Sequence, residues 1–273
     1  MKHIIVTTDF SASSRNALAY ACSLAIKGDY TILLMHIYTM PVNYTGDGIA
    51  LASVSHAISH VEDSLTDEME WVKESYPAIN ISYKAETGTL IECLEEEISA
   101  AVPELIVMGA ASDYGDLWMW DSQLLEALTS MPVPVLIVPK HVVYGSLKQI
   151  AFACDYRNLC IPRQVQFIKW LTVYTGAQLH IVHITRDKPV NEEVKMKNEL
   201  LLQEVLYDAA PKYYAIEDPH VIDAIAGFVK EHNIDMLIVV PHKHGVWHSI
   251  FSQSHTKQLA KLNHIPVLAI PEP

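Results

Sequence analysis

The apolar residues of this chain gather in short runs, and the runs recur in the same order in both halves. Residues 2–11 read KHIIVTTDFS and residues 148–158 read KQIAFACDYRN, each an apolar run that ends in an acid. Continuous runs rich in β-branched residues predict strands that are covered on both faces. Helix-like stretches separate the runs, and this regular alternation indicates parallel sheets with helices on both faces.

The repetition extends to the end of each half. The later markers are ELIVMG at 104–109 and MPVPVLIVP at 131–139, then DMLIVVP at 235–241 and HIPVLAIP at 264–271. A repeating unit of about 130–145 residues has the size of a domain. We therefore predict an α/β chain of two tandem doubly wound domains, residues 1–140 and 148–273, with a linker at 141–147. Each half is expected to have a core of its own.

The pattern predicts five strands in each half. First-half strands are expected at 2–8, 30–37, 80–84, 105–108 and 135–138, with helices at 12–27, 53–75, 89–101 and 122–130. Second-half strands are expected near 148–154, 178–184, 212–216, 236–240 and 266–270, with helices near 160–175, 190–208, 219–232 and 254–263. Ligands of such sheets bind beyond the carboxyl ends of the strands, where the strand order reverses. The candidate site of each half is therefore the loop after its first strand, facing the loop after its fourth.

Charge and composition exclude several classes of function. The chain has a net charge of −13, all of it in the first half, and no basic stripe, so a nucleic-acid partner is not expected. No apolar run is long enough to span a membrane, and no signal-peptide pattern is visible at the N-terminus. The four cysteines show no C-x-x-C spacing, which favours reduced core thiols. These features predict a cytoplasmic protein.

The order and spacing of these markers resemble the universal stress protein family, once per half. The shared features are the first strand ending in an acid, the LLMHI and HIVHI strands at 33–37 and 180–184, ELIVMG, and the final strand ending in Pro. The resemblance implies a five-stranded sheet of order 3-2-1-4-5 in each half. It also implies that the domains pair through their last strands, Val135–Val138 with Val267–Ile270. A homodimer of the whole chain stays open.

ATP-binding members of that family carry G-x2-G-x9-G-[ST] after the fourth strand, where glycines let backbone amides approach phosphates. In the first half Gly109 and Ser122 match this motif, but Ser112 and Asp121 stand in place of glycines. In the second half only Ser254 matches. The resemblance places Asp9, and by repetition Asp155, near the base and ribose. We interpret both phosphate loops as degenerate, so no cofactor is expected, with ATP bound in the first half as the alternative.

Two sets of histidines remain. His242, His244 and His248 have the spacing of a three-ligand zinc site, but we interpret them as solvated polar residues because no further ligand motif supports a metal. His36 and His183 end equivalent strands, which predicts a ring nitrogen bonded to the backbone in both halves. No catalytic triad or G-x-S-x-G elbow is present. The sequence thus predicts a non-enzymatic stress-response protein that acts by binding or interaction, with nucleotide binding in the first half as the alternative.

Overall fold

The computed structural model describes residues 2–26, 28–38, 48–110, 122–145, 147–154, 156, 162–185, 192–241 and 260–271. The elements of the first half are β1 (His3–Thr8), α1 (Ala12–Ala25), β2 (Thr31–Tyr38), α2 (Gly48–Ser75), β3 (Ile81–Thr87), α3 (Leu90–Ala100), β4 (Leu105–Ala110), α4 (Ser122–Ser130) and β5 (Val135–Pro139). Those of the second half are β6 (Gln149–Cys154), α5 (Pro162–Thr175), β7 (Gln178–Thr185), α6 (Glu192–Val205), η1 (Tyr207–Ala209), β8 (Lys212–Glu217), α7 (Val221–Glu231), β9 (Met236–Val239), η3 (Ala260–Leu262) and β10 (Val267–Ala269).

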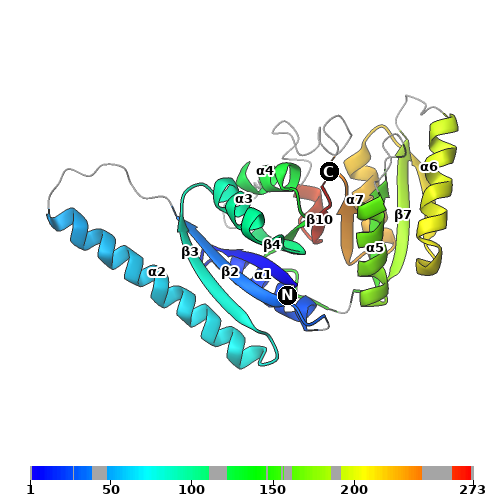
Figure 1. Ribbon diagram of the computed structural model, residues 1–273. Coiled ribbons are helices and arrows are strands. Elements are labelled where there is room, and N and C mark those ends of the chain that lie inside the picture. Colours follow the sequence, from blue (N-terminus) through cyan, green and yellow to red (C-terminus); the bar gives the residue numbers. More distant parts are fainter. Residues whose placement is uncertain are drawn as a thin grey trace.

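The described strands form one sheet with the order β3-β2-β1-β4-β5-β10-β9-β6-β7-β8 (Figure 1). Within each half the five strands are parallel and follow the order 3-2-1-4-5, which confirms the predicted fold class. The halves meet where β5 and β10 pair antiparallel, with Leu136 opposite Leu268. Among the described strands, β5 and β10 form the only antiparallel pair. Because this pair joins the equivalent last strands of the two halves, the halves are related by an approximate two-fold rotation.

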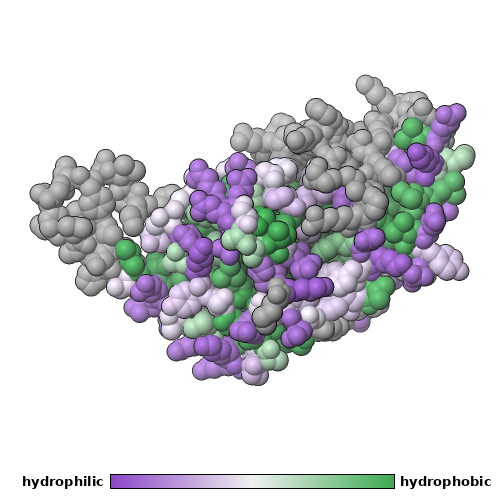
Figure 2. All heavy atoms as spheres, viewed as in Figure 1, coloured by the Kyte–Doolittle hydropathy of each residue, from purple (hydrophilic) through white to green (hydrophobic). Residues whose placement is uncertain are grey.

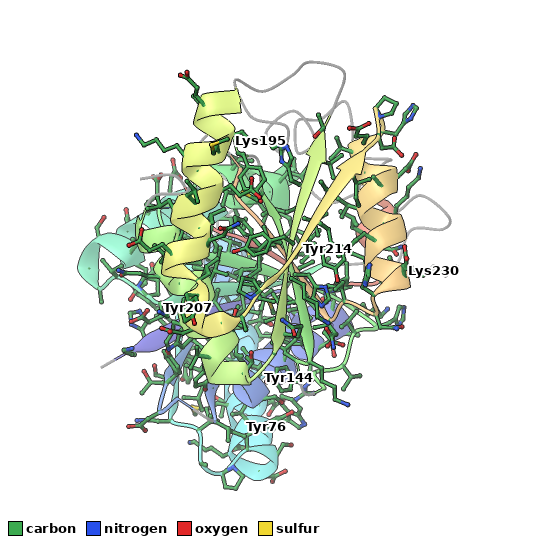
Figure 3. All side chains as sticks on the ribbon, turned by 90° about the vertical axis from the view of Figure 1, so that its right-hand side faces the viewer. Tyr76, Tyr144, Lys195, Tyr207, Tyr214 and Lys230 are labelled. Atoms are coloured by element: carbon green, nitrogen blue, oxygen red, sulfur yellow. The ribbon has the colours of Figure 1, made fainter. Side chains whose placement is uncertain are left out.

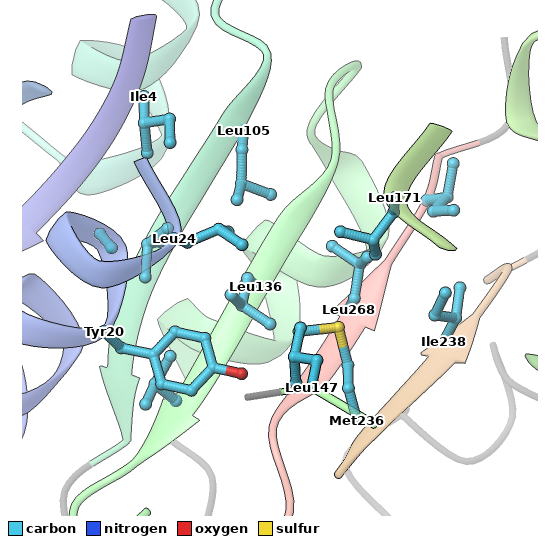
Figure 4. Packing of buried hydrophobic residues seen from close by; sticks show 14 of the residues in the cluster. Ile4, Tyr20, Leu24, Leu105, Leu136, Leu147, Leu171, Met236, Ile238 and Leu268 are labelled. Atoms are coloured by element: carbon cyan, nitrogen blue, oxygen red, sulfur yellow. The ribbon is translucent and has the colours of Figure 1, made fainter. Parts of the chain in front are cut away.

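The hydrophobic core follows the two faces of this sheet. One cluster of buried residues lies under α1, α2, α5 and α6, and the other lies under α3, α4, α7 and η3. Each cluster contains residues of both halves; Figure 4 shows Tyr20 and Leu136 beside Leu268 and Met236. The expectation of one core per half is therefore wrong. The β5–β10 pair brings the two inner sheets edge to edge, so their side chains pack into common layers.

Two predicted helices differ from the observed elements. Helix α2 begins at Gly48, five residues before the expected start, because Ile49 to Ala52 are good helix formers that extend the periodic segment. The helix expected at 254–263 falls largely outside the described residues. Its described end, Ala260–Leu262, is a 3-10 turn.

The segment between the halves packs against the first half. The Asn16 side chain of α1 donates to the carbonyl oxygens of Pro139 and Val142, at 3.0 and 2.9 Å. Tyr144 contacts Tyr20 edge to face, with ring centroids 4.9 Å apart. A contact farther along α1 joins the halves directly, since the Tyr174 hydroxyl donates to the Leu24 carbonyl oxygen at 2.9 Å. The connection and the contact between α1 and α5 thus hold the two halves together.

Candidate functional site

The loop after β1 is shaped by hydrogen bonds among its own polar residues. The Ser11 side chain caps α1 by accepting from the Ser14 amide, in keeping with the preference for serine at this position of a helix. The exposed Asp9 carboxylate accepts from the Ser11 amide at 3.0 Å, so it shapes the turn before the helix and does not cap it. Burial acts to raise the pKa of Asp9, but hydrogen bonds from Ser11 and Ser14 outweigh burial and lower the pKa.

Phe10 connects this loop to the end of β2. Its backbone has φ of 63°, a left-handed conformation that is strained for a bulky residue. The Phe10 amide donates to the Thr8 hydroxyl at 3.0 Å, and its ring lies on the His36 imidazole with centroids 4.4 Å apart. The His36 ring in turn stacks on Tyr38 at 5.8 Å. Three partly buried rings therefore form a platform beside Asp9 at the carboxyl ends of β1 and β2.

The His36 ring is anchored to the first strand. Its Nδ1 lies 2.7 Å from the Thr8 carbonyl oxygen, and since a carbonyl only accepts, Nδ1 carries the proton. In the second half the His183 Nδ1 lies 3.1 Å from the Cys154 carbonyl oxygen, an equivalent contact. The prediction of backbone-bonded histidines in both halves is confirmed.

The equivalent rings of the second half are buried. The Tyr156 ring lies on the His183 imidazole with centroids 4.6 Å apart, and these residues are 5% and 3% exposed. The side chain of Asn198, a buried residue of α6, donates to the Tyr156 carbonyl oxygen at 2.7 Å. Helix α6 therefore holds Tyr156 in place against the sheet, whereas the rings of the first half remain partly open.

Gly109 lies in β4, opposite the first turn of α1. A Cβ atom built at this position would lie 2.5 Å from the Ser13 carbonyl oxygen and 2.7 Å from the Ser14 nitrogen. No side chain fits at such distances without moving the backbone. Gly109 is therefore needed for the close contact of α1 with β4, whatever binds in the crevice.

The cationic side chain in the first turn of α1 is engaged by α2. The Arg15 Nε lies 3.3 Å from the Glu68 Oε2, and the guanidinium lies 4.5 Å from the centre of the Trp71 ring. Burial raises the pKa of Glu68, while the positive charge of Arg15 acts against it. Arg15 is thus directed to α2, away from the crevice.

Most of the other predicted site residues fall outside the part of the chain that the structure describes. Ser122 is the exposed first residue of α4. Outside the described residues lie Ser112, Asp155, Ser254, His242, His244 and His248. No group of three potential metal-ligating side chains occurs in the described part of the chain. In that part, no helix is long and apolar enough to cross a membrane.

The aromatic platform is the feature that sequence reasoning missed. Phe10 and Tyr156 directly follow the repeated acid of each half, so comparison of the two copies could have revealed a repeated ring. Asn198 and Tyr38 gave no such signal, because neither stands in a repeated motif.

A cavity of about 20 Å³ lies between the halves under α1 and α5. It has room for roughly one water molecule. Its walls are almost entirely apolar, including Leu24, Leu136 and Trp170. We therefore place the candidate ligand site at the platform and not in this cavity.

Comparison with known proteins agrees with this architecture. Residues 1–139 match the sequence model of the Universal stress protein family. Universal stress protein Slr1230 of Synechocystis is 22% identical over 98% of this chain and 99% of its own length.

Two solved structures share the fold over nearly the whole chain. A universal stress protein from Archaeoglobus fulgidus is 18% identical with a TM-score of 0.70, covering 99% of this chain and 98% of its own. The cytoplasmic domain of a prokaryotic cation chloride cotransporter is 10% identical with a TM-score of 0.55, covering 98% and 94%. With the family model matching half of its length, this chain belongs to the universal stress protein family, as a tandem two-domain member.

Proposed function

We propose that this protein is a non-enzymatic binding module of the stress response whose ligand site lies in the first half. The proposal rests on the difference in exposure between two equivalent crevices. Phe10 and His36 are partly open beside the exposed Asp9, whereas Tyr156 and His183 are buried. Rings that are buried in this way offer little surface to a ligand. The second half then contributes the scaffold and the surfaces for interaction.

Nucleotide binding in the first half is the second candidate, and the platform is the observation that favours it. The partly exposed rings of Phe10, His36 and Tyr38 offer apolar surface against which a planar base can pack, and Asp9 offers an acceptor for an exocyclic amino group. The sequence of the phosphate loop gives nucleotide binding less support. Ser112 and Asp121 replace glycines there, and a carboxylate competes with phosphate for the positive end of a helix. We expect a base or nucleoside to contribute more of the affinity than the phosphates of ATP.

The ionisation of Asp9 supports a role without catalysis. A general base works best when its pKa lies near the ambient pH. The serine hydrogen bonds lower the pKa of Asp9 instead, so this carboxylate is a weak proton acceptor at neutral pH. Asp9 therefore suits binding better than proton transfer.

We further propose the domain division 1–140 and 148–273, with residues 141–147 as a packed connection, and a cytoplasmic location. The location is supported by Cys22 and Cys93, which are buried and not in disulfides.

Calorimetric titration of the full chain with adenosine, AMP and ATP plus magnesium tests both candidates. We expect one ligand per chain, loss of binding in Asp9→Ala, and unchanged binding in the matched second-half variant Asp155→Ala. Binding that survives Asp9→Ala and Ser122→Ala would place the ligand elsewhere. Absence of binding at millimolar concentration would reject the nucleotide candidate, and nucleotide hydrolysis above the protein-free rate would contradict a non-enzymatic role.

A further inference from the structure

The outer face of α6 and η1 carries large apolar side chains that nothing in the described chain covers. Met196, Leu200 and Tyr207 are 62%, 59% and 80% exposed. We call these three residues the α6 face. The equivalent helix of the first half, α2, exposes no large hydrophobic side chain over its described residues 58–75. The apolar surface is therefore a property of the second half and not of the fold.

The α6 face is continuous along the helix. Met196 and Leu200 are one turn apart, and Tyr207 lies two turns farther, where η1 follows α6. The opposite side of the helix packs inward through Asn198, which is 5% exposed. In Figure 3, α6 stands at the front, with Lys195 toward one end and Tyr207 at the other. Figure 2 shows hydrophobic residues among polar ones at this end of the molecule. An uncovered apolar stripe of this kind marks an interaction surface.

We propose that two copies of this chain associate through their α6 faces. Strand pairing does not provide this contact, because β5 and β10 already pair with each other inside one chain. Charge favours a contact at this end. Residues 1–140 carry the whole net charge of −13, whereas residues 141–273 are neutral. Helix α6 lies at the end of the molecule opposite to α2 (Figure 1), so such a dimer keeps the two acidic halves apart.

The charges beside the stripe suit an antiparallel helix pair. Lys197 and Glu204 are exposed and two turns apart, so they lie on the same flank of the α6 face. In a two-fold symmetric pair the same patch meets itself, and residues of one flank face each other in the reverse order. Lys197 of each copy then faces Glu204 of the other, which forms two reciprocal ion pairs around the apolar contact.

The size of the face sets the expected affinity. A helix of 14 residues is about 21 Å long, so the pair falls at the small end of specific interfaces. We expect reversible dimerisation with a dissociation constant on the order of 10–100 µM. Sedimentation velocity of the full chain from about 1 to about 300 µM measures it. Wild type should shift from monomer to dimer across this range, and Leu200→Lys should remain a monomer.

A matched control uses Val173 of α5, which is 62% exposed and lies outside the α6 face. Val173→Lys should dimerise as wild type does. Both substitutions are at exposed positions, and circular dichroism should show native folding for each. A wild-type chain that stays monomeric at about 300 µM would overturn the proposal. Equal loss of dimer in Leu200→Lys and Val173→Lys would overturn it as well.

A charge exchange tests the antiparallel register. Lys197→Glu and Glu204→Lys should each weaken dimerisation roughly threefold to tenfold, because each replaces two attractive pairs by two repulsive ones. The double variant should restore affinity close to wild type. Failure of the double variant to recover would reject the antiparallel pairing. Because no ligand enters these experiments, their outcome is independent of the proposed ligand site.

Discussion

Gly109 illustrates how one residue of a binding motif is also required for packing. The backbone of Ser13 and Ser14 approaches it so closely that a methyl group has no space. The neighbouring ring of Phe10 shows the converse case, a strained backbone held in place by a hydrogen bond to Thr8 and by contact with His36. Around β1, single residues are thus constrained by contacts within the protein as well as by any ligand.

We expect Gly109→Ala to lower the free energy of unfolding by about 1–3 kcal/mol, the usual cost of forcing extra atoms into a packed site. Gly145→Ala is the matched control, since a Cβ atom there would meet nothing within 4 Å. Urea unfolding of the two variants measures the difference. Equal stability of Gly109→Ala and wild type would show that α1 moves away from β4 at little cost.

His180 makes stability depend on pH. It is 3% exposed, its Nε2 lies 2.7 Å from the Gln149 Oε1, and burial together with the charges of His232 and Lys212 lowers its pKa. The rings of Tyr214 and Phe228 complete its surroundings. The unfolded chain therefore binds a proton at His180 more readily than the folded chain does. The contribution of neutral His180 is complete above the unfolded pKa of 6.5 and is lost as the pH falls through the lower folded value.

Unfolding free energies between pH 8 and pH 5 should accordingly fall less steeply in His180→Gln than in wild type. His60→Gln, at an exposed position of α2, serves as the control and should keep the wild-type slope. If His180→Gln also keeps the wild-type slope, the proton uptake belongs to other groups.

Among the larger elements, the connection between the halves behaves as a packed segment. Asn16 donates to the carbonyl oxygens of Pro139, at the end of β5, and of Val142 in the connection. The Asp235 carboxylate accepts from the amides of Lys148 and Gln149, just after the connection, at 2.7 and 2.8 Å. Leu147 between these contacts is 5% exposed. The connection is therefore held at both ends, although its Gly and Ser content is typical of a flexible linker.

We expect Asn16→Ala to destabilise the protein by about 1–3 kcal/mol, because two carbonyl acceptors lose their donor. Val143→Ala is the control in the same segment, since Val143 is 79% exposed. Thermal unfolding of both variants tests this. A shift in Val143→Ala as large as that of Asn16→Ala would mean that the Asn16 hydrogen bonds are not what holds the segment.

The molecule as a whole is organised by one sheet with a core layer on each face. Since both layers contain residues of the two halves, neither half can lose its packing without exposing apolar surface of the other. Leu136 and Leu268, paired across the central strands and both buried, lie where this coupling is closest. The repeated sequence thus forms two topological units with a common interior.

We therefore expect a single cooperative unfolding transition, and we expect Leu268→Ala to lower the stability of both halves by about 2–5 kcal/mol. Native-state hydrogen exchange resolved by peptide measures this. Equal loss of protection in β1 and β6 is the expected result. Faster exchange confined to the second half would contradict the shared core.

Local pattern was enough for the elements, and the strand order of each half followed from the family resemblance. Apolar runs and their alternation with helices depend on neighbouring residues, so β1, α1 and β7 lie within a few residues of their expected positions. The serine cap of α1 and the repeated histidines were predictable for the same reason, since each depends on a short motif or on its repetition. The two crevices look alike in these terms, because each has an acid, a ring and a histidine.

Three-dimensional packing determined how far those two crevices differ. Tyr156 is buried because Asn198, more than forty residues away, binds its carbonyl, whereas Phe10 stays partly open. Packing between distant segments also produces the shared core and leaves the α6 face uncovered. Burial depends on contacts between segments distant in sequence, and a hydrophobic pattern records which side chains are apolar but not which neighbour covers them.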